Sequence, residues 1–141
     1  MSRESDIQQM RMKGKIIVYT LACANIALNF VEWLVNEHYT LMGLAIQIVV
    51  SIALCQGFNR LRYLFVIGSA AVCALRILEY LNRPWVFLAQ SVPVQVHNVM
   101  FIAYLLVCMS LLLFSKSVGE FFRSRKKERK YTDQKFRKKS K

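Results

Sequence analysis

The sequence predicts an all-α protein of the membrane, with four transmembrane helices in one bundle and both ends of the chain in the cytoplasm. Hydrophobic residues make up 55% of the 141 residues and gather in four long segments. In lipid such segments must be helical, because only helices and closed barrels satisfy their own backbone hydrogen bonds. If the chain crosses the membrane four times, the regions rich in basic residues all lie on the same side of the membrane.

The four predicted spans follow a short N-terminal segment, residues 1–15, and comprise residues 16–35, 40–57, 61–81 and 97–115. Each reaches the ~17 to 25 residues that cross ~30 Å of hydrocarbon. The first span has no cleavage pattern after it and is longer than a signal-peptide core, so we expect a retained anchor. Residues 36–39 form a polar turn after it.

The loop at 82–96 holds both prolines of the chain, with Trp85 and Phe87 between them. Its apolar composition is compatible with a lipid-facing segment that lies along the outer membrane interface, as a short helix that starts after Pro84. The alternative is an ordinary packed loop. The sequence leaves these two alternatives open.

Positive charge is concentrated at the C-terminal end of the chain. The net charge is +12, and residues 116–141 contain twelve basic and three acidic residues, so they carry nine of these charges. Other basic residues precede the first span and separate the second from the third, which predicts cytoplasmic termini. We expect the bacterial cytoplasmic (inner) membrane. Lys138 and Lys139 resemble a dilysine retrieval signal, which leaves the endoplasmic reticulum membrane as an alternative.

The basic tail, residues 116–141, loses its apolar periodicity from about residue 124 onward. We therefore expect it to be disordered or adsorbed on anionic lipid at the cytoplasmic face of the bilayer. Its candidate lipid-binding residues are Arg123, Arg125, Lys126, Lys127, Arg129 and Lys130. A nucleic-acid partner is not expected, because such domains distribute their basic residues over a folded, water-exposed face.

Ionisable residues within the third span predict a polar layer in the outer half of the bilayer. An unpaired charge in hydrocarbon costs at least about 2.5 to 3.5 kcal/mol, so such residues usually face other helices, a partner or a wet cavity. A rise of ~1.5 Å per residue brings five residues of three spans to a similar depth. They are Glu32, Arg76, Glu79, His97 and Asn98.

Several ion pairs are compatible with this layer. Arg76 can pair with Glu79 on its own helix or with Glu32 on another, and Glu79 can reach Arg83. The cluster is then either a clamp that fixes the helix register or a functional site for an ion, a proton or a polar partner group. The sequence does not decide between these roles.

Three amides extend the polar residues toward the middle of the membrane. Asn25 and Asn29 lie on one helical stripe with Glu32, and Gln47 of the second span is at a depth to meet them. They are candidates for interhelical hydrogen bonds or for the lining of a path. Small residues in the second and third spans, Gly68 and Ser69 among them, predict close contact between those two helices.

An enzyme is not expected, and neither is a cofactor. The chain contains no HExxH or GxSxG motif, and its histidines lack other metal ligands at a suitable spacing. Each span holds one cysteine, without a CxxC pair, so no disulfide framework is predicted. Cys23, Cys73 and Cys108 fall at comparable depths, but small apolar packing is the favoured interpretation over a soft-metal site.

Two functional hypotheses follow. The first is a small protein that binds or regulates another membrane component through its outer-half polar layer, for example an immunity or accessory factor. The alternative is a homo-oligomeric transporter or channel, in which the same polar residues line the path. A third, weaker hypothesis is an assembly subunit whose tail binds anionic lipid or acidic partners. Each implies a protein partner or a homo-oligomer within the bilayer.

Overall fold

A computed structural model describes residues 3–35 and 40–139, apart from the side chains of residues 3, 86, 87 and 133–139. This part of the chain is all helical between short turns. Its elements are α1 (Arg3–Val35), α2 (Leu41–Cys55), α3 (Asn59–Asn82), α4 (Pro84–Ala89), α5 (Val92–Phe114) and α6 (Lys116–Lys139).

Three of these helices are long and apolar enough to cross a membrane, as expected of an integral membrane protein. They are α1, from Glu4 onward, α3 and α5. The predicted second span differs: α2 has 15 residues, which corresponds to about 22 Å of helix, against a hydrocarbon core of ~30 Å. The helix is shorter than predicted because Thr40 and the Gln56–Gly57 turn stop it at both ends.

Other boundaries also differ from those predicted. The N-terminal segment continues the first helix, since α1 begins at Arg3, and α5 begins at Val92. A short helix starts at Pro84, which was one of the two alternatives predicted for the loop. Residues 36–39, the predicted polar turn, lie outside the described residues.

Local chemistry explains where the helices begin and end. The Thr40 hydroxyl accepts a hydrogen bond from the Gly43 N–H at 3.2 Å and so caps α2. Gly57 follows α2 with a φ of 77°, in the left-handed region that glycine enters without steric cost. Pro84 disfavours helical geometry at Arg83, which ends α3.

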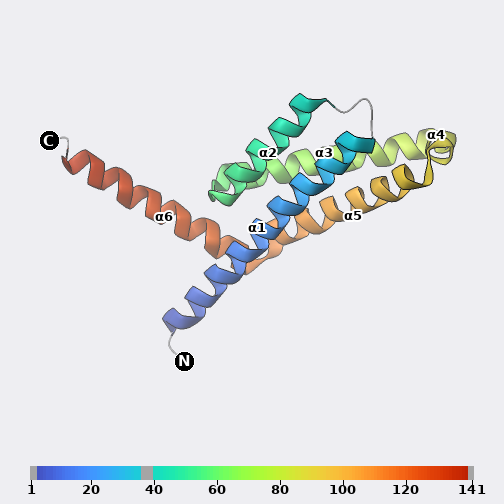
Figure 1. The fold of residues 1–141 in the computed structure, drawn as a ribbon. Helices are drawn as coiled ribbons and strands as arrows, with labels where there is room; N and C mark the ends of the chain where they lie inside the picture. Colours follow the sequence, from blue (N-terminus) through green and yellow to red (C-terminus); the bar gives the residue numbers. More distant parts are fainter. Residues whose placement is uncertain (1–2, 36–39, 140–141) are drawn as a thin grey trace.

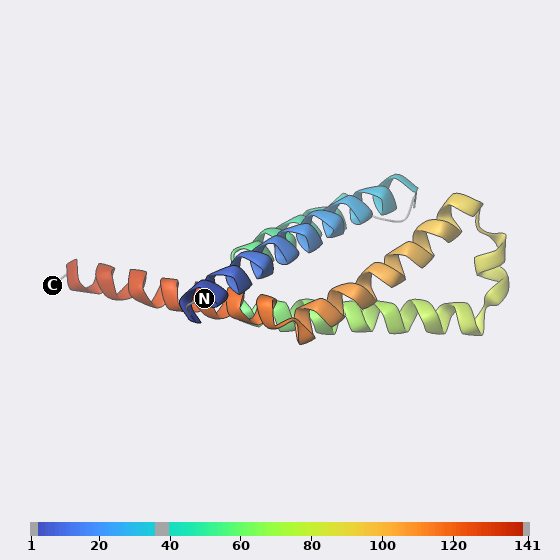
Figure 2. The ribbon, with the colours of Figure 1, turned by 90° about the horizontal axis from the view of Figure 1, so that it is seen from below.

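The helices form two antiparallel pairs with α6 across one end. α1 packs chiefly against α2 and α6, and α3 packs chiefly against α5. Figures 1 and 2 show α4 joining the ends of α3 and α5 that lie farthest from α6. In both views α6 extends away from the bundle near the N-terminus of the chain.

The basic tail is helical through Lys139, so of the two predicted alternatives disorder is wrong, while adsorption on anionic lipid stays a prediction. A helical break at Ser115, whose φ and ψ are −72° and 115°, separates α6 from α5. The Ser115 hydroxyl then accepts a hydrogen bond from the Val118 N–H at 3.4 Å. Sequence patterning missed this helix because only its first turns contribute apolar side chains to the interior.

Those first turns are tightly packed. Val118, Phe121 and Phe122 are buried together with residues of α1, α2, α3 and α5. A Cβ at Gly14 would overlap the backbone carbonyl of Ser117, so α1 and α6 approach closely there. The main hydrophobic core is therefore at the basic end of the molecule.

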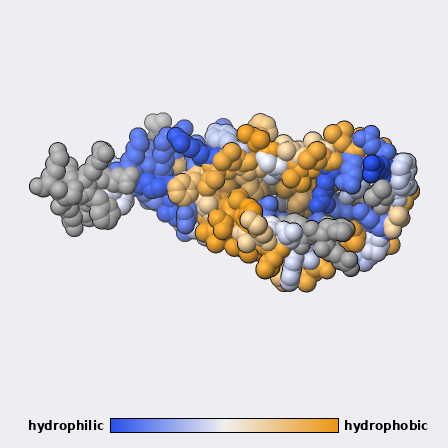
Figure 3. All heavy atoms as spheres, turned by 90° about the horizontal axis from the view of Figure 1, so that it is seen from above, coloured by the Kyte–Doolittle hydropathy of each residue, from blue (hydrophilic) through white to orange (hydrophobic). Residues whose placement is uncertain are grey.

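Large apolar side chains cover much of the surface of α2, α3 and α5. On the face that Figure 3 presents, they form a band between hydrophilic α6 at one end and a second hydrophilic region toward the other end. Contiguous exposed apolar surface of this size is unusual for a soluble monomer. It is the surface expected of helices that face lipid.

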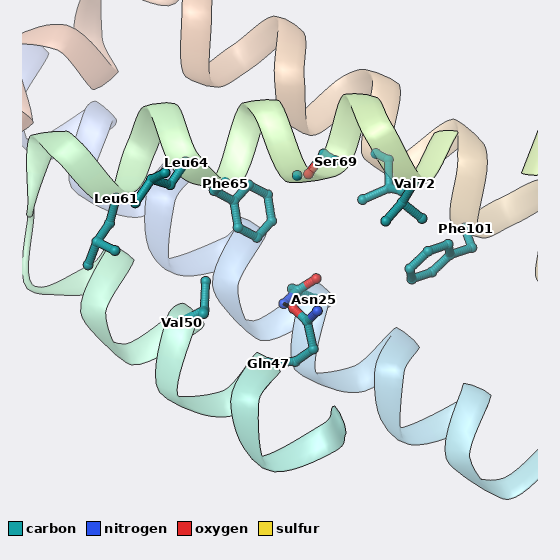
Figure 4. A pocket seen from close by; sticks show the side chains of 11 residues that line it. Asn25, Gln47, Val50, Leu61, Leu64, Phe65, Ser69, Val72 and Phe101 are labelled. Atoms are coloured by element: carbon teal, nitrogen blue, oxygen red, sulfur yellow. Dashed lines mark hydrogen bonds between the residues drawn. The ribbon is translucent and has the colours of Figure 1, made fainter. Parts of the chain in front are cut away.

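The predicted close contact between the second and third spans is wrong. α3 meets α2 much less than it meets α5, and no atom lies within 4 Å of a Cβ placed on Gly68. Phe65 of α3 and Val50 of α2 line the space between the two helices, as Figure 4 shows.

Candidate functional site

The polar layer centres on Glu32, which is 3% exposed. Its Oε1 lies 2.8 Å from Nη2 of Arg76, and its Oε2 lies 2.7 Å from Nε2 of His97. These three side chains come from α1, α3 and α5. One carboxylate thus joins the three helices that are long enough to cross a membrane.

Arg76 extends this network beyond Glu32. Its Nη1 donates a hydrogen bond to Oδ1 of Asn98, and its guanidinium carbon lies 5.2 Å from the centroid of the Phe101 ring. Asn98 in turn donates from Nδ2 to Oε1 of Gln90 at 3.0 Å. Gln90 lies between α4 and α5, so the network also fixes the end of the α3–α5 hairpin.

The chemistry of these contacts favours a charged, fully paired carboxylate. An ionised carboxylate only accepts hydrogen bonds, so Nε2 of His97 must carry a proton when it meets Glu32. A buried acid without a partner would be very unfavourable, and the Arg76 cation together with the His97 donor offsets that cost. The two carboxylate oxygens of Glu32 thus connect α1 to α3 and to α5.

Four of the five predicted layer residues lie together, and Glu79 does not. Glu79 is exposed, and neither Arg76 nor Arg83 is paired with it in the described structure. The pairing of Arg76 with Glu79 on its own helix is therefore not formed. Glu79 follows Arg76 by three residues, which places it about 60° away around the axis of α3. This rotation takes Glu79 off the face of α3 that meets α1 and α5.

The amides of α1 and α2 form a separate network. Nδ2 of Asn25 donates to Oε1 of Gln47 at 3.2 Å and to Oγ of Ser51 at 3.0 Å. Asn29 donates to the Asn25 backbone oxygen at 2.8 Å and to its Oδ1 at 3.2 Å. The contacts of Asn25 with Gln47 and Ser51 are interhelical hydrogen bonds, whereas those between Asn29 and Asn25 lie within α1. Ser51, which is 1% exposed, belongs to this network, although it is not among the polar residues predicted from the sequence.

A cavity of about 310 Å³ opens between α2 and α3, and we refer to it as the α2–α3 groove. Figure 4 shows Asn25 and Gln47 at its floor, opposite Phe65 and Ser69 of α3. The lining is Asn25, Gln47, Val50, Leu61, Leu64, Phe65, Gly68, Ser69, Val72, Phe101 and Leu105. Of the predicted polar residues, Asn25 and Gln47 thus face a space, while Asn29, Glu32 and Arg76 are not among the residues that line it.

The predicted interface loop is partly described. Trp85 of α4 is 65% exposed, and the side chain of Phe87 lies outside the described residues. At the other end of the molecule, Lys126, Lys127 and Lys130 are exposed. Arg123 pairs with Glu120 at 2.8 Å and Arg125 with Glu128 at 3.1 Å.

Arg62 is a buried cation that the sequence analysis used only for topology. It is 8% exposed, donates from Nη2 to the Leu113 carbonyl at 3.2 Å and lies 5.6 Å from the Phe122 ring. Arg62 lies at the start of α3, seven residues before Ser69 and on the same helical face. This spacing was the signal in the sequence that could have indicated its burial.

Among the described residues, no group of three or more His, Cys, Asp and Glu side chains is placed to hold a metal ion. Cys23, Cys55, Cys73 and Cys108 are free thiols. Comparison of the chain with protein-family models, with curated proteins and with solved structures finds no match. Functional inference therefore depends on the geometry of the chain itself.

Proposed function

We propose that this protein binds or regulates another membrane component, as an immunity or accessory factor would, through the outer-half surface of α3 and α4. In this proposal the Glu32 network is the clamp that shapes the surface, and Glu79 and Trp85 are the contact residues. The protein would reside in the bacterial cytoplasmic membrane, with the endoplasmic reticulum membrane as the alternative.

The proposed topology is four spans with both termini in the cytoplasm. It is supported by the gathering of the basic regions at one end. Gly14 of α1 lies against Ser117 of α6, and a Cβ at Gly57 would lie 2.7 Å from the Arg125 side chain. The positive-inside rule assigns such an end to the cytoplasm. Because α2 is short, the bilayer would have to thin beside it or its flanking residues would have to complete the crossing.

The single observation that carries the binding proposal is the exposure of Glu79 on an apolar helix face. Its neighbours Leu75, Leu78 and Leu81 are 68%, 53% and 72% exposed, and no ion pair of Glu79 is formed within the described residues. A carboxylate at the rim of a lipid-facing surface is costly unless it reaches the interface or meets a partner group. Trp85 lies on α4, close to the same end of α3.

The transporter alternative has one favourable observation, the groove lined by Asn25 and Gln47. Those amides, however, already hydrogen-bond to each other at 3.2 Å. The charged residues that would drive transport pair with one another outside the groove lining. Binding of a partner therefore explains more of these contacts than a transport path does.

Site-specific photocrosslinking in native membranes tests the proposal. A photoreactive residue at Leu78, which is 53% exposed on α3, should give a discrete adduct, whereas one at Val107, 54% exposed on α5, should give none. Adding Glu79→Gln should remove the adduct, and Glu128→Gln, at the other end of the molecule, should leave it. An adduct between two copies of the chain identifies the partner as the protein itself. Absence of any adduct at Leu78 overturns the proposal.

A further inference from the structure

A basic pocket lies where the α2–α3 turn meets α6. Its volume is about 680 Å³, and its lining comprises Gly57, Phe58, Asn59, Arg60, Leu61, Lys126, Arg129 and Lys130. Four of these eight residues are cations and none is acidic. The basic pocket is thus built to attract an anion.

Arg129 fixes the wall of the basic pocket. It donates hydrogen bonds to the carbonyls of Gly57 and of Gln56, the latter at 3.4 Å. Its guanidinium carbon also lies 4.0 Å from the centroid of the Phe58 ring. These contacts tie α6 to the turn between α2 and α3, so the cations contributed by the two segments are held near one another.

The other three cations are available to a ligand. Arg60, Lys126 and Lys130 are exposed, and within the described residues they form no ion pair. The pocket also contains the start of α3, where Phe58 provides no side-chain cap. The positive end of that helix dipole adds to the field of the cations.

The basic pocket adjoins the α2–α3 groove, because Leu61 lines both. Figure 4 shows Leu61 at the end of the groove nearest the α2–α3 turn, with Val72 and Phe101 toward the opposite end. From Leu61 to Val72 the groove follows α3 for about 16 Å. This is close to the depth of one leaflet, half of the ~30 Å hydrocarbon core.

The groove has the character of an acyl-chain site over most of this length. Leu64, which is 62% exposed, lies along its α3 edge, and no atom lies within 4 Å of a Cβ placed on Gly68. The polar floor is already hydrogen-bonded through Asn25, Gln47 and Ser51. An apolar chain can therefore enter without leaving the Asn25 amide nitrogen or the Gln47 amide oxygen unpaired.

We propose that the basic pocket and the α2–α3 groove together bind one anionic phospholipid, with its phosphate among Arg60, Lys126 and Lys130 and an acyl chain along α3. A phosphate suits this pocket because its oxygens accept several charge-assisted hydrogen bonds at once. The groove supplies the apolar surface that a soluble phosphate could not use. This inference is independent of the proposed partner at the opposite end of the molecule.

The charge requirement is tested with the full-length protein in neutral detergent, by native mass spectrometry with phosphatidylglycerol, phosphatidylcholine or glycerol phosphate as the probe. Unaltered protein should retain phosphatidylglycerol in preference to the other two. Arg60→Gln with Lys130→Gln should weaken retention about tenfold or more, given the attraction of each basic residue for anionic lipid. The matched control, Lys13→Gln with Lys116→Gln, removes the same charge outside the pocket and should change retention less than twofold.

Gly68→Leu tests the groove, because its side chain would occupy open space within the lining. It should reduce phosphatidylglycerol retention, while Gly119→Leu, also in open space but on α6, should not. If the two double substitutions reduced phosphatidylglycerol retention equally, the lipid would be attracted to the basic end of the molecule as a whole. That result would overturn the proposed site. Glycerol phosphate binding as well as the lipid, with Gly68→Leu inert, would overturn the lipid and leave a free-phosphate site.

Discussion

Oε1 of Glu32 lies 2.8 Å from Nη2 of Arg76, across 44 positions of the sequence. This pair joins α1 to α3, and His97 adds α5 through the other carboxylate oxygen at 2.7 Å. Because Glu32 is 3% exposed and Arg76 23% exposed, the acid is enclosed and the cation reaches the edge of the bundle. The network thus links α1, α3 and α5, and α3 carries Glu79.

Arg76→Ala should destabilise the protein strongly, because it removes the cation that pairs with the buried Glu32 carboxylate. Breaking a buried pair by removing one member typically costs about 3 to 5 kcal/mol. The measurement is the free energy of unfolding in mixed micelles, followed by circular dichroism. Glu32→Gln combined with Arg76→Gln should be less destabilised than the sum of the single changes. Additive losses would show that the two side chains do not interact.

The Glu32 layer was predictable from the sequence because two or three ionisable or amide residues stand out in each of three apolar spans. The helical rise alone then sets their depth. The sequence could not choose between Glu32 and Glu79 as the partner of Arg76, since that choice depends on which face of α3 meets α1. Helices α1, α3 and α5 were likewise predictable from the length of their apolar segments. Helix α6 was not, because its buried Phe121 and Phe122 precede a stretch whose composition is that of a solvated tail.

The groove was missed for a similar reason. Small residues such as Gly68 and Ser69 allow close helix contact but do not require it. Whether α2 fills the surface they leave depends on the length of α2 and on the turn at Gly57. Tertiary packing decides both, and neither is visible in the spacing of small residues.

Asn25→Ala should lower stability modestly, through the loss of its hydrogen bonds to Gln47 and Ser51. Interhelical hydrogen bonds within membranes average about 0.6 kcal/mol and reach about 1.7 kcal/mol. A double-mutant cycle with Ser51→Ala in the same unfolding assay isolates the 3.0 Å contact between the two side chains. We expect a coupling energy of about 0.6 kcal/mol, and a coupling indistinguishable from zero would assign the stability to packing.

Gly57→Ala should loosen α6 from the bundle. Its φ of 77° costs an L-residue roughly 1 to 2 kcal/mol, and the new Cβ would press on the Arg125 side chain at 2.7 Å. Limited proteolysis of the detergent-solubilised protein should then cleave α6 faster. Gly119→Ala, which meets no atom within 4 Å, is the matched control and should leave the rate unchanged. Equal protection of all three proteins would contradict the proposed role of the turn.

Arg62→Leu should release the junction between α5 and α6 even though it removes a charge from the interior. Arg62 donates to the Leu113 carbonyl at 3.2 Å, one of the terminal carbonyls of α5 that no later turn of that helix can satisfy. Leucine keeps most of the apolar contact with Phe122 but leaves that carbonyl without this donor, so the angle at Ser115 should vary more. Spin labels at exposed Tyr63 and Lys127 report this as a broadened distance distribution. Arg62→Lys should retain a narrower distribution than Arg62→Leu, since its ammonium can still donate to the carbonyl. If both variants match the unaltered protein, packing of Val118 and Phe122 alone sets the junction.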